Sequence, residues 1–245
     1  MDRKTFDRII EDQRQGMVDT LRAWVRIPSL KDEPAPNAPF GPKLREMLDK
    51  TLADCKSLGF EVNDIDGYAG DASLGEGSDE DALAILAHVD IVPAGDGWTR
   101  EPFGAQLEGD ILYGRGTGDD KGPLAAALYA MHAVKQAGIP LKRKVKLIFG
   151  CDEESGMEDM KYYQQHAVMP RSGFSPDASY PVINLEKGMV GLHLGAPVSE
   201  EGLKVLSLNV GERQNVIPGA ASALVAGDSG MIARVEEVAK KYGCH

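Results

Sequence analysis

The sequence has no apolar run approaching the ~20 residues that a membrane-spanning helix needs. Its N-terminal stretch, MDRKTFDRIIEDQ, is charged and lacks the apolar core of a secretory signal peptide. We therefore expect neither a membrane partner nor export by a signal of that kind.

Cysteine is also scarce. The three cysteines, Cys55, Cys151 and Cys244, are far apart in the 245-residue chain, and no two of them form a CxxC pair. This usage is typical of proteins in a reducing compartment. The predicted location is the cytoplasm.

Basic residues are outnumbered, since 27 Lys and Arg against 38 Asp and Glu give a formal net charge of −11 at pH 7. Contact with phosphates requires clustered Lys and Arg, so the composition argues against a nucleic-acid partner. We interpret the one basic cluster, KRKVK at residues 142–146, as the solvated start of a strand. The acidic surplus can include metal-binding carboxylates.

Several common catalytic motifs are missing. Neither GxSxG nor HExxH occurs, which excludes serine hydrolases of that type and gluzincins. The glycine-rich stretch YGRGTGDDKGP is not a dinucleotide fingerprint, because Asp119 stands where that motif needs glycine. It is not a Walker loop either, because its lysine is not followed by Ser or Thr.

The apolar patterning predicts helices alternating with buried strands. Amphipathic helices are predicted within residues 5–27, 43–58, 122–138 and 156–166, and strands within 82–90, 144–151 and 181–187. This alternation is typical of an α/β sheet that helices cover on both faces.

The pattern changes after about residue 190. Residues 202–211 and 221–227 alternate like strands of a half-exposed sheet, and an amphipathic helix is predicted from Asp228 or Ser229. We expect a first domain over residues 1–190 and the beginning of an α+β domain over residues 191–245. Too little chain follows for that second domain to be complete.

Acidic residues and one histidine follow or precede the predicted strands in four clusters. They are His88 with Asp90, Asp119 in GDDKGP, the pair Glu153 and Glu154 in CDEESG, and Asp177 before the predicted strand 181–187. Each alone has a plain structural alternative: a hydrogen-bonded histidine, an acidic helix cap, a solvated loop or a turn aspartate. Together, at strand ends where α/β sheets bind ligands, they favour a nitrogen and oxygen ligand set for zinc or manganese.

The ordered set HVD, GRGTGDDKGP, DEESG and SPDASYP resembles the co-catalytic dinuclear zinc metallopeptidases: aminoacylases, carboxypeptidase G, desuccinylases and dipeptidases. The longer stretches HVDIVPAGDGWTREPF and FSPDASYPVINLEKG are most similar to the PepV-type Xaa-His dipeptidases. The resemblance implies a zinc-exopeptidase-like mixed sheet flanked by helices, followed by an α+β lid domain. Other branches of the family dimerise through the lid, whereas PepV-type enzymes are generally monomeric, so we expect a monomer for the full-length enzyme.

The resemblance assigns roles to particular residues. It implies that His88 and Asp177 bind one divalent ion, that Glu154 binds a second, and that Asp119 bridges the two. Two further residues act on these: Asp90 would orient His88, and Glu153 would be the general base. The ions are expected to be zinc, although manganese and cobalt accept the same ligands.

Three further expectations come from the same resemblance. The peptide bond between Asp119 and Asp120 is expected to be cis, and Asn215 is expected to contact the substrate. In the family, the second ion also takes a histidine from a segment beyond the position of residue 245. We therefore expect the sequence to be the N-terminal portion of a longer enzyme and to lack full activity alone.

The function predicted from these motifs is hydrolysis of the peptide bond of dipeptides and other short peptides by a metal-activated water. One alternative within the same chemistry is a deacylase for N-acyl amino acids or N-succinyl-diaminopimelate. An alternative of another class is a non-catalytic fragment that binds a metal or a partner.

Overall fold

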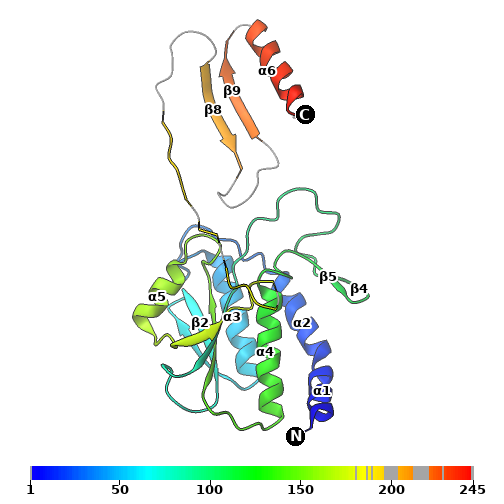
Figure 1. The fold of residues 1–245 in the computed structure, drawn as a ribbon, viewed down its shortest axis with the longest axis vertical. Helices are drawn as coiled ribbons and strands as arrows, with labels where there is room; N and C mark the ends of the chain where they lie inside the picture. Colours follow the sequence, from blue (N-terminus) through cyan, green and yellow to red (C-terminus); the bar gives the residue numbers. More distant parts are fainter. Residues whose placement is uncertain are drawn as a thin grey trace. The chain divides into compact units, whose positions relative to one another are not determined.

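The structure is a computed structural model that describes residues 2–179, 181–185, 187–188, 190–195, 204–211, 221–227 and 229–243. The chain divides into two compact units, Met1–Asn184 and Leu185–His245 (Figure 1). None of the described helices is both long enough and apolar enough to cross a membrane.

The helices of the first unit are α1 (Arg3–Asp12), α2 (Arg14–Val25), α3 (Pro42–Ser57), α4 (Lys121–Gln136) and α5 (Glu158–His166). They match the predicted helices with one correction. The first predicted helix is broken at Gln13, which ends α1 and precedes α2. The Gln13 side chain lies 2.7 Å from Nδ1 of His132 on α4, a contact that fastens the break to the neighbouring helix.

The main sheet has the order β1-β2-β6-β3-β7. Its strands are β1 (Glu61–Ile65), β2 (Ala69–Leu74), β3 (Leu83–His88), β6 (Val145–Gly150) and β7 (Ser172–Phe174). The last three are parallel to one another, while β1 and β2 are antiparallel additions. A short hairpin, β4 (Gln106–Glu108) with β5 (Ile111–Tyr113), lies outside the sheet.

Helices cover both faces of the sheet. Alternate residues of β6 point to opposite faces, and each set packs against helices. Leu147 and Phe149 pack into the larger core cluster with residues of α2, α3 and α4. Ile148 packs on the other side with Met160 and Tyr163 of α5. The predicted mixed sheet flanked by helices is confirmed.

One predicted strand is wrong. Residues 181–185 form no strand, and Val182 and Leu185 are 78% and 86% exposed. No described strand pairs with this stretch, so its alternating apolar side chains stay exposed. Asp177 therefore follows the short edge strand β7, which pairs with β3, and does not precede a strand as predicted.

The second unit contains β8 (Lys204–Val210), β9 (Ala221–Ala226) and α6 (Ser229–Lys241). The two strands pair antiparallel. All three elements lie where the sequence predicts them.

Candidate metal centre

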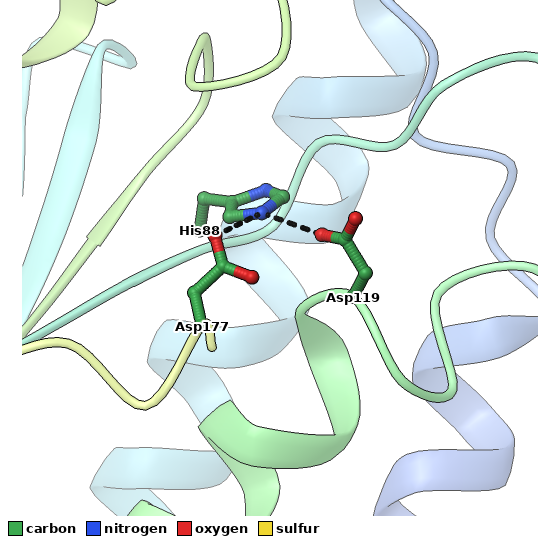
Figure 2. A group of neighbouring side chains, drawn as sticks. All are labelled: His88, Asp119 and Asp177. Carbon is green, nitrogen blue, oxygen red and sulfur yellow. Dashed lines mark hydrogen bonds and ion pairs between the residues drawn. The ribbon is translucent and has the colours of Figure 1, made fainter. Parts of the chain in front are cut away.

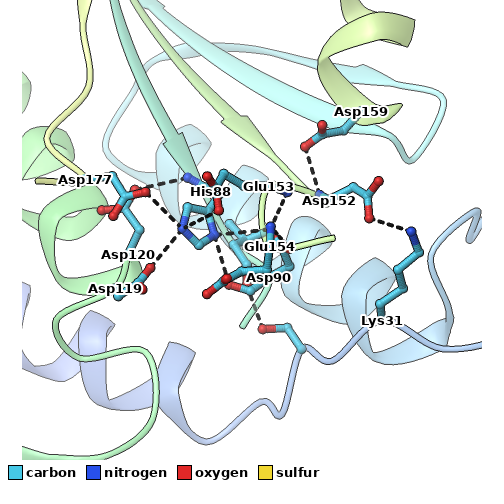
Figure 3. Close-up of polar contacts among 12 residues, drawn as sticks. Lys31, His88, Asp90, Asp119, Asp120, Asp152, Glu153, Glu154, Asp159 and Asp177 are labelled. Atoms are coloured by element: carbon cyan, nitrogen blue, oxygen red, sulfur yellow. Dashed lines mark hydrogen bonds and ion pairs between the residues drawn. The ribbon is translucent and has the colours of Figure 1, made fainter. Parts of the chain in front are cut away.

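The candidate site lies at the carboxyl ends of the three parallel strands. His88 is the last residue of β3, and Glu153 and Glu154 follow β6 by a few residues. Asp177 follows β7, and Asp119 comes just before α4. Figure 3 shows these side chains gathered around the imidazole of His88. Ends of parallel strands meet at one edge, so this topology brings residues up to 89 positions apart into one site.

The two ring nitrogens of His88 have different surroundings. Nδ1 lies 3.0 Å from the backbone oxygen of Asp90 and 3.1 Å from its carboxylate Oδ1. Nε2 lies 3.0 Å from Asp119 Oδ1 and 3.4 Å from Asp177 Oδ2 (Figure 2). Nδ1 donates its proton to Asp90, so Nε2, which donates to the carboxylates when it is protonated, is the nitrogen whose lone pair would bind a metal ion once that proton is lost.

The spacing of these atoms fits a metal ion. Two ligand atoms at zinc–ligand distances of ~2.0–2.2 Å in a tetrahedral site lie about 3.3–3.6 Å apart. The separations of 3.0 and 3.4 Å from His88 Nε2 to the carboxylates of Asp119 and Asp177 are close to that value. Each of the three residues offers a ligand atom, and all three atoms lie within 4.8 Å of one another.

A second group combines the same histidine with the two glutamates. His88, Glu153 and Glu154 offer one ligand atom each, again within 4.8 Å of one another. Glu153 Oε2 lies 3.9 Å from His88 Nε2, and its side chain is 42% exposed. The two groups share one histidine, an arrangement in which two ions can lie close together.

Asp90 joins the histidine to the glutamates. Its carboxylate, which is buried, accepts hydrogen bonds from the backbone N–H groups of Glu153 at 3.2 Å and Glu154 at 3.0 Å. The same carboxylate faces Nδ1 of His88. Asp90 is therefore placed to orient the imidazole, as the sequence suggests, and also to hold the loop after β6.

Burial and the charges of neighbouring residues shift the pKa values of the residues in this site. Burial, followed by the negative charge of Asp119, raises the pKa of Glu154 to about 7. Burial is also the main cause that raises the pKa of Glu153. The hydrogen bond from His88 lowers the pKa of Asp119. Burial opposes protonation of His88, yet its hydrogen bonds to Asp119, Asp177 and Asp90 raise the pKa of the imidazole.

Asp120 adds a buried carboxyl group at the same place. Its side chain is fully buried, and Oδ2 accepts a hydrogen bond of 3.1 Å from the backbone N–H of His88. Oδ1 is buried and has no hydrogen-bond partner among the described residues. Burial raises the pKa of Asp120 to about 7. A divalent cation nearby would stabilise this excess of carboxylates, so the donor set fits such an ion.

The backbone of the GRGTGDDKGP segment, residues 114–123, is held in an unusual form. The Asp119–Asp120 peptide bond is cis, so that prediction is confirmed. Gly116 has a φ of +89°, and a Cβ on Gly122 would lie 2.0 Å from the carbonyl oxygen of Thr117. These two positions therefore require glycine.

The structure brings together six of the residues singled out in the sequence: His88, Asp90, Asp119, Glu153, Glu154 and Asp177. The seventh, Asn215, lies outside the described residues. Three buried residues that the sequence reading missed also contribute: Asp120, Lys121 and Asp152. In the sequence, Asp120 and Asp152 are marked only by their position next to Asp119 and Glu153.

Comparison with known proteins places the fold and site in a family. A family model described as Peptidase family M20/M25/M40 matches residues 84–245, which include every residue of the candidate centre. The chain belongs to this family. The predicted family resemblance is confirmed.

Curated relatives of this peptidase family match over most of the chain. "Putative dipeptidase YtjP" of Bacillus subtilis is 38% identical over 221 residues, which cover 88% of this chain and 47% of the relative. "Putative dipeptidase SH1171" of Staphylococcus haemolyticus is 35% identical over 223 residues, with coverage of 88% and 47%. The chain spans about half the length of the curated relatives it matches.

Solved structures support the same fold. Human carnosine dipeptidase 1 is similar with a TM-score of 0.57 and 25% identity, over 66% of this chain and 37% of that one. The dipeptidase Dug1p of Saccharomyces cerevisiae has a TM-score of 0.57 at 21% identity, with the same coverage.

Proposed function

We propose that this protein is a metal-dependent dipeptidase that hydrolyses the peptide bond of dipeptides and other small peptides. The observation that carries the proposal is the placement of Asp119 and Asp177 at ligand spacing from His88 Nε2, beside two glutamates. The names of its curated relatives and the similarity to human carnosine dipeptidase 1 support dipeptides as the substrate class.

In this proposal, His88 and Asp177 would hold one ion, Glu154 would hold the other, and Asp119 would serve both. Asp90 keeps the His88 lone pair directed at the ions. The ions are proposed to be zinc, which accepts imidazole and carboxylate ligands; manganese and cobalt accept the same set. When bound, they polarise the peptide carbonyl and lower the pKa of a water molecule.

Glu153 is proposed as the general base. It accepts a proton from the attacking water and delivers it to the amine that leaves. Burial raises the pKa of the Glu153 carboxyl, which makes the carboxylate a stronger base, and its 42% exposed side chain leaves it accessible to water and substrate.

The domain division, the role of Asn215, the oligomeric state and the cellular location are further parts of this proposal. Residues 1–190 form the metal-binding domain, and residues 191–245 begin a lid domain that contributes Asn215 to substrate binding. The enzyme works as a monomer in the cytoplasm. The cysteine usage supports that location, since the described Cys55 and Cys151 are unpaired thiols.

Metal binding by the chain tests the proposed centre. Replacing His88 by alanine removes the nitrogen ligand of the ion proposed to bind His88 and Asp177, and is expected to weaken cobalt or zinc binding at that position by at least about 100-fold in a calorimetric titration. His166→Ala, the same change at an exposed histidine on α5, is expected to leave binding unchanged. Equal metal binding by wild type and His88→Ala would refute the centre.

Paired substrate assays then separate dipeptidase from deacylase activity. The enzyme is expected to hydrolyse carnosine-like dipeptides faster than N-acetyl amino acids or N-succinyl-diaminopimelate. Faster turnover of the acylated substrates would favour the deacylase. Tight metal binding without any hydrolysis in the full-length protein would favour a binding function.

A further inference from the structure

Residues 24–31, here called the anchor segment, run from the end of α2 past the carboxyl ends of β3 and β6. The Ser29 hydroxyl donates a hydrogen bond of 2.6 Å to the backbone oxygen of Val89. The Ile91 N–H donates one of 3.2 Å to the backbone oxygen of Ser29. The anchor segment is thus fastened on both sides of Asp90.

The anchor segment also holds the start of α4. The ammonium group of Lys121, which is fully buried, donates to the backbone oxygens of Trp24 at 3.0 Å and Ile27 at 2.8 Å. Lys121 follows Asp119 and Asp120 directly in the chain. A second segment of the metal centre is therefore fixed to the same eight residues.

The third contact is an ion pair. Lys31 Nζ lies 2.6 Å from Oδ1 of Asp152, whose side chain is fully buried, while Lys31 itself is 37% exposed. Oδ2 of Asp152 accepts from the N–H of Glu158, at the start of α5. Figure 3 shows Lys31 reaching Asp152 from the side away from His88.

The loop that carries the two glutamates is therefore held at three successive residues, Asp152, Glu153 and Glu154. Asp152 is tied by Lys31 through its side chain and by Asp159 Oδ2, which accepts from its N–H at 2.8 Å. The next two N–H groups, those of Glu153 and Glu154, both donate to Asp90. A rotation of Asp152 would therefore move the N–H groups that bind Asp90.

We propose that Lys31 is a positioning residue for Glu153 and Glu154 and acts through Asp152. The inference rests on the proposed metal centre for its functional meaning. The Asp152 carboxylate is fully buried, and the ammonium group of Lys31, 2.6 Å from its Oδ1, stabilises the negative charge in that position. Without that group, the buried carboxylate is left without its cation and turns toward water, and the loop leaves its place on Asp90.

Hydrogen exchange of the metal-free chain tests this directly. Lys31→Met keeps the aliphatic stem and removes the charge, and is expected to speed exchange of the amides in residues 153–158 by about tenfold or more. Amides of β3 and β6 are expected to keep wild-type rates. Lys31→Arg restores protection, because a guanidinium group also donates to Asp152, and Asp152→Asn reproduces the loss.

A matched control is Lys43→Met, which removes an exposed ion pair with Glu46 on α3. It is expected to change no exchange rate in residues 153–158. Unchanged exchange there in Lys31→Met would overturn the proposal. So would a loss of protection spread equally over β3 and β6, because the contact would then serve stability alone.

Cobalt titration gives a second readout. Lys31→Met is expected to weaken the ion bound by Glu154 by about 10–100-fold and to leave the ion bound by His88 and Asp177 within about twofold. Equal weakening of both ions would overturn the positioning role. A wild-type chain that binds no cobalt would refute the proposed metal centre instead, and the exchange experiment would still decide the role of Lys31.

Discussion

Replacing Glu153 by glutamine is expected to lower dipeptide turnover by about 10²–10⁴-fold and to leave the bound metal in place. Glutamine keeps the length and shape of the side chain but cannot accept a proton at neutral pH. The backbone N–H of residue 153 still donates to Asp90, so the loop keeps its position. The measurement is kcat alongside metal content, in a preparation whose wild type hydrolyses dipeptides.

Glu154→Gln is the matched control, since it makes the same change one residue along the same loop. Its carboxylate is proposed to bind an ion, so its loss is expected to reduce metal content as well as turnover. Both residues donate their N–H groups to Asp90, so backbone disturbance is the same in the two variants. Equal metal loss in both, or near-wild-type turnover in Glu153→Gln, would contradict the assigned roles.

The position of the centre was predictable because its residues adjoin recognisable apolar strands. His88 ends β3, and the glutamates follow β6. Both strands are short, largely apolar runs that can be recognised in the sequence. Parallel pairing of β3 and β6 then places His88 opposite Gly150, next to the glutamate loop. The sheet arrangement thus converts two separate motifs into one site.

The supporting contacts were not predictable, because they join residues far apart in the chain. Lys31 and Asp152 are 121 positions apart, and neither belongs to an apolar pattern. Asp90 accepts from N–H groups 63 and 64 positions later, which no local spacing reveals. Strand β2 was missed for a related reason: its sequence, AGDASL, is small and polar, and its burial comes from pairing with β6.

The second large effect is expected on the free energy of unfolding, at the ion pair formed by the buried aspartate of β2. Asp71 and Lys146 of β6 are both almost fully buried, with Lys146 Nζ 3.2 Å from Asp71 Oδ2. Tyr163 of α5 and Asn63 of β1 donate hydrogen bonds of 2.7 and 2.8 Å to the same carboxylate. This network links four elements, β1, β2, β6 and α5, on the α5 side of the sheet, at the end of β6 away from the metal centre.

Lys146→Met is expected to lower the free energy of unfolding by about 3–5 kcal/mol, because it leaves the Asp71 carboxylate buried without its cation. Denaturant unfolding followed by tryptophan fluorescence measures this loss. Lys161→Met, which removes an exposed pair with Glu158, is expected to change stability by less than about 1 kcal/mol.

Adding Asp71→Asn to Lys146→Met separates the burial of a charge from the loss of packing. Asparagine still accepts from Tyr163 and carries no charge, so the double variant is expected to recover at least about half of the stability lost in Lys146→Met. The recovery follows because most of the free energy lost comes from the uncompensated buried carboxylate of Asp71, while the 2.9 Å pair that Lys146 also makes with the partly exposed Asp79 contributes less. If the double variant is less stable than Lys146→Met, the ion pair itself stabilises the sheet beyond neutralising Asp71.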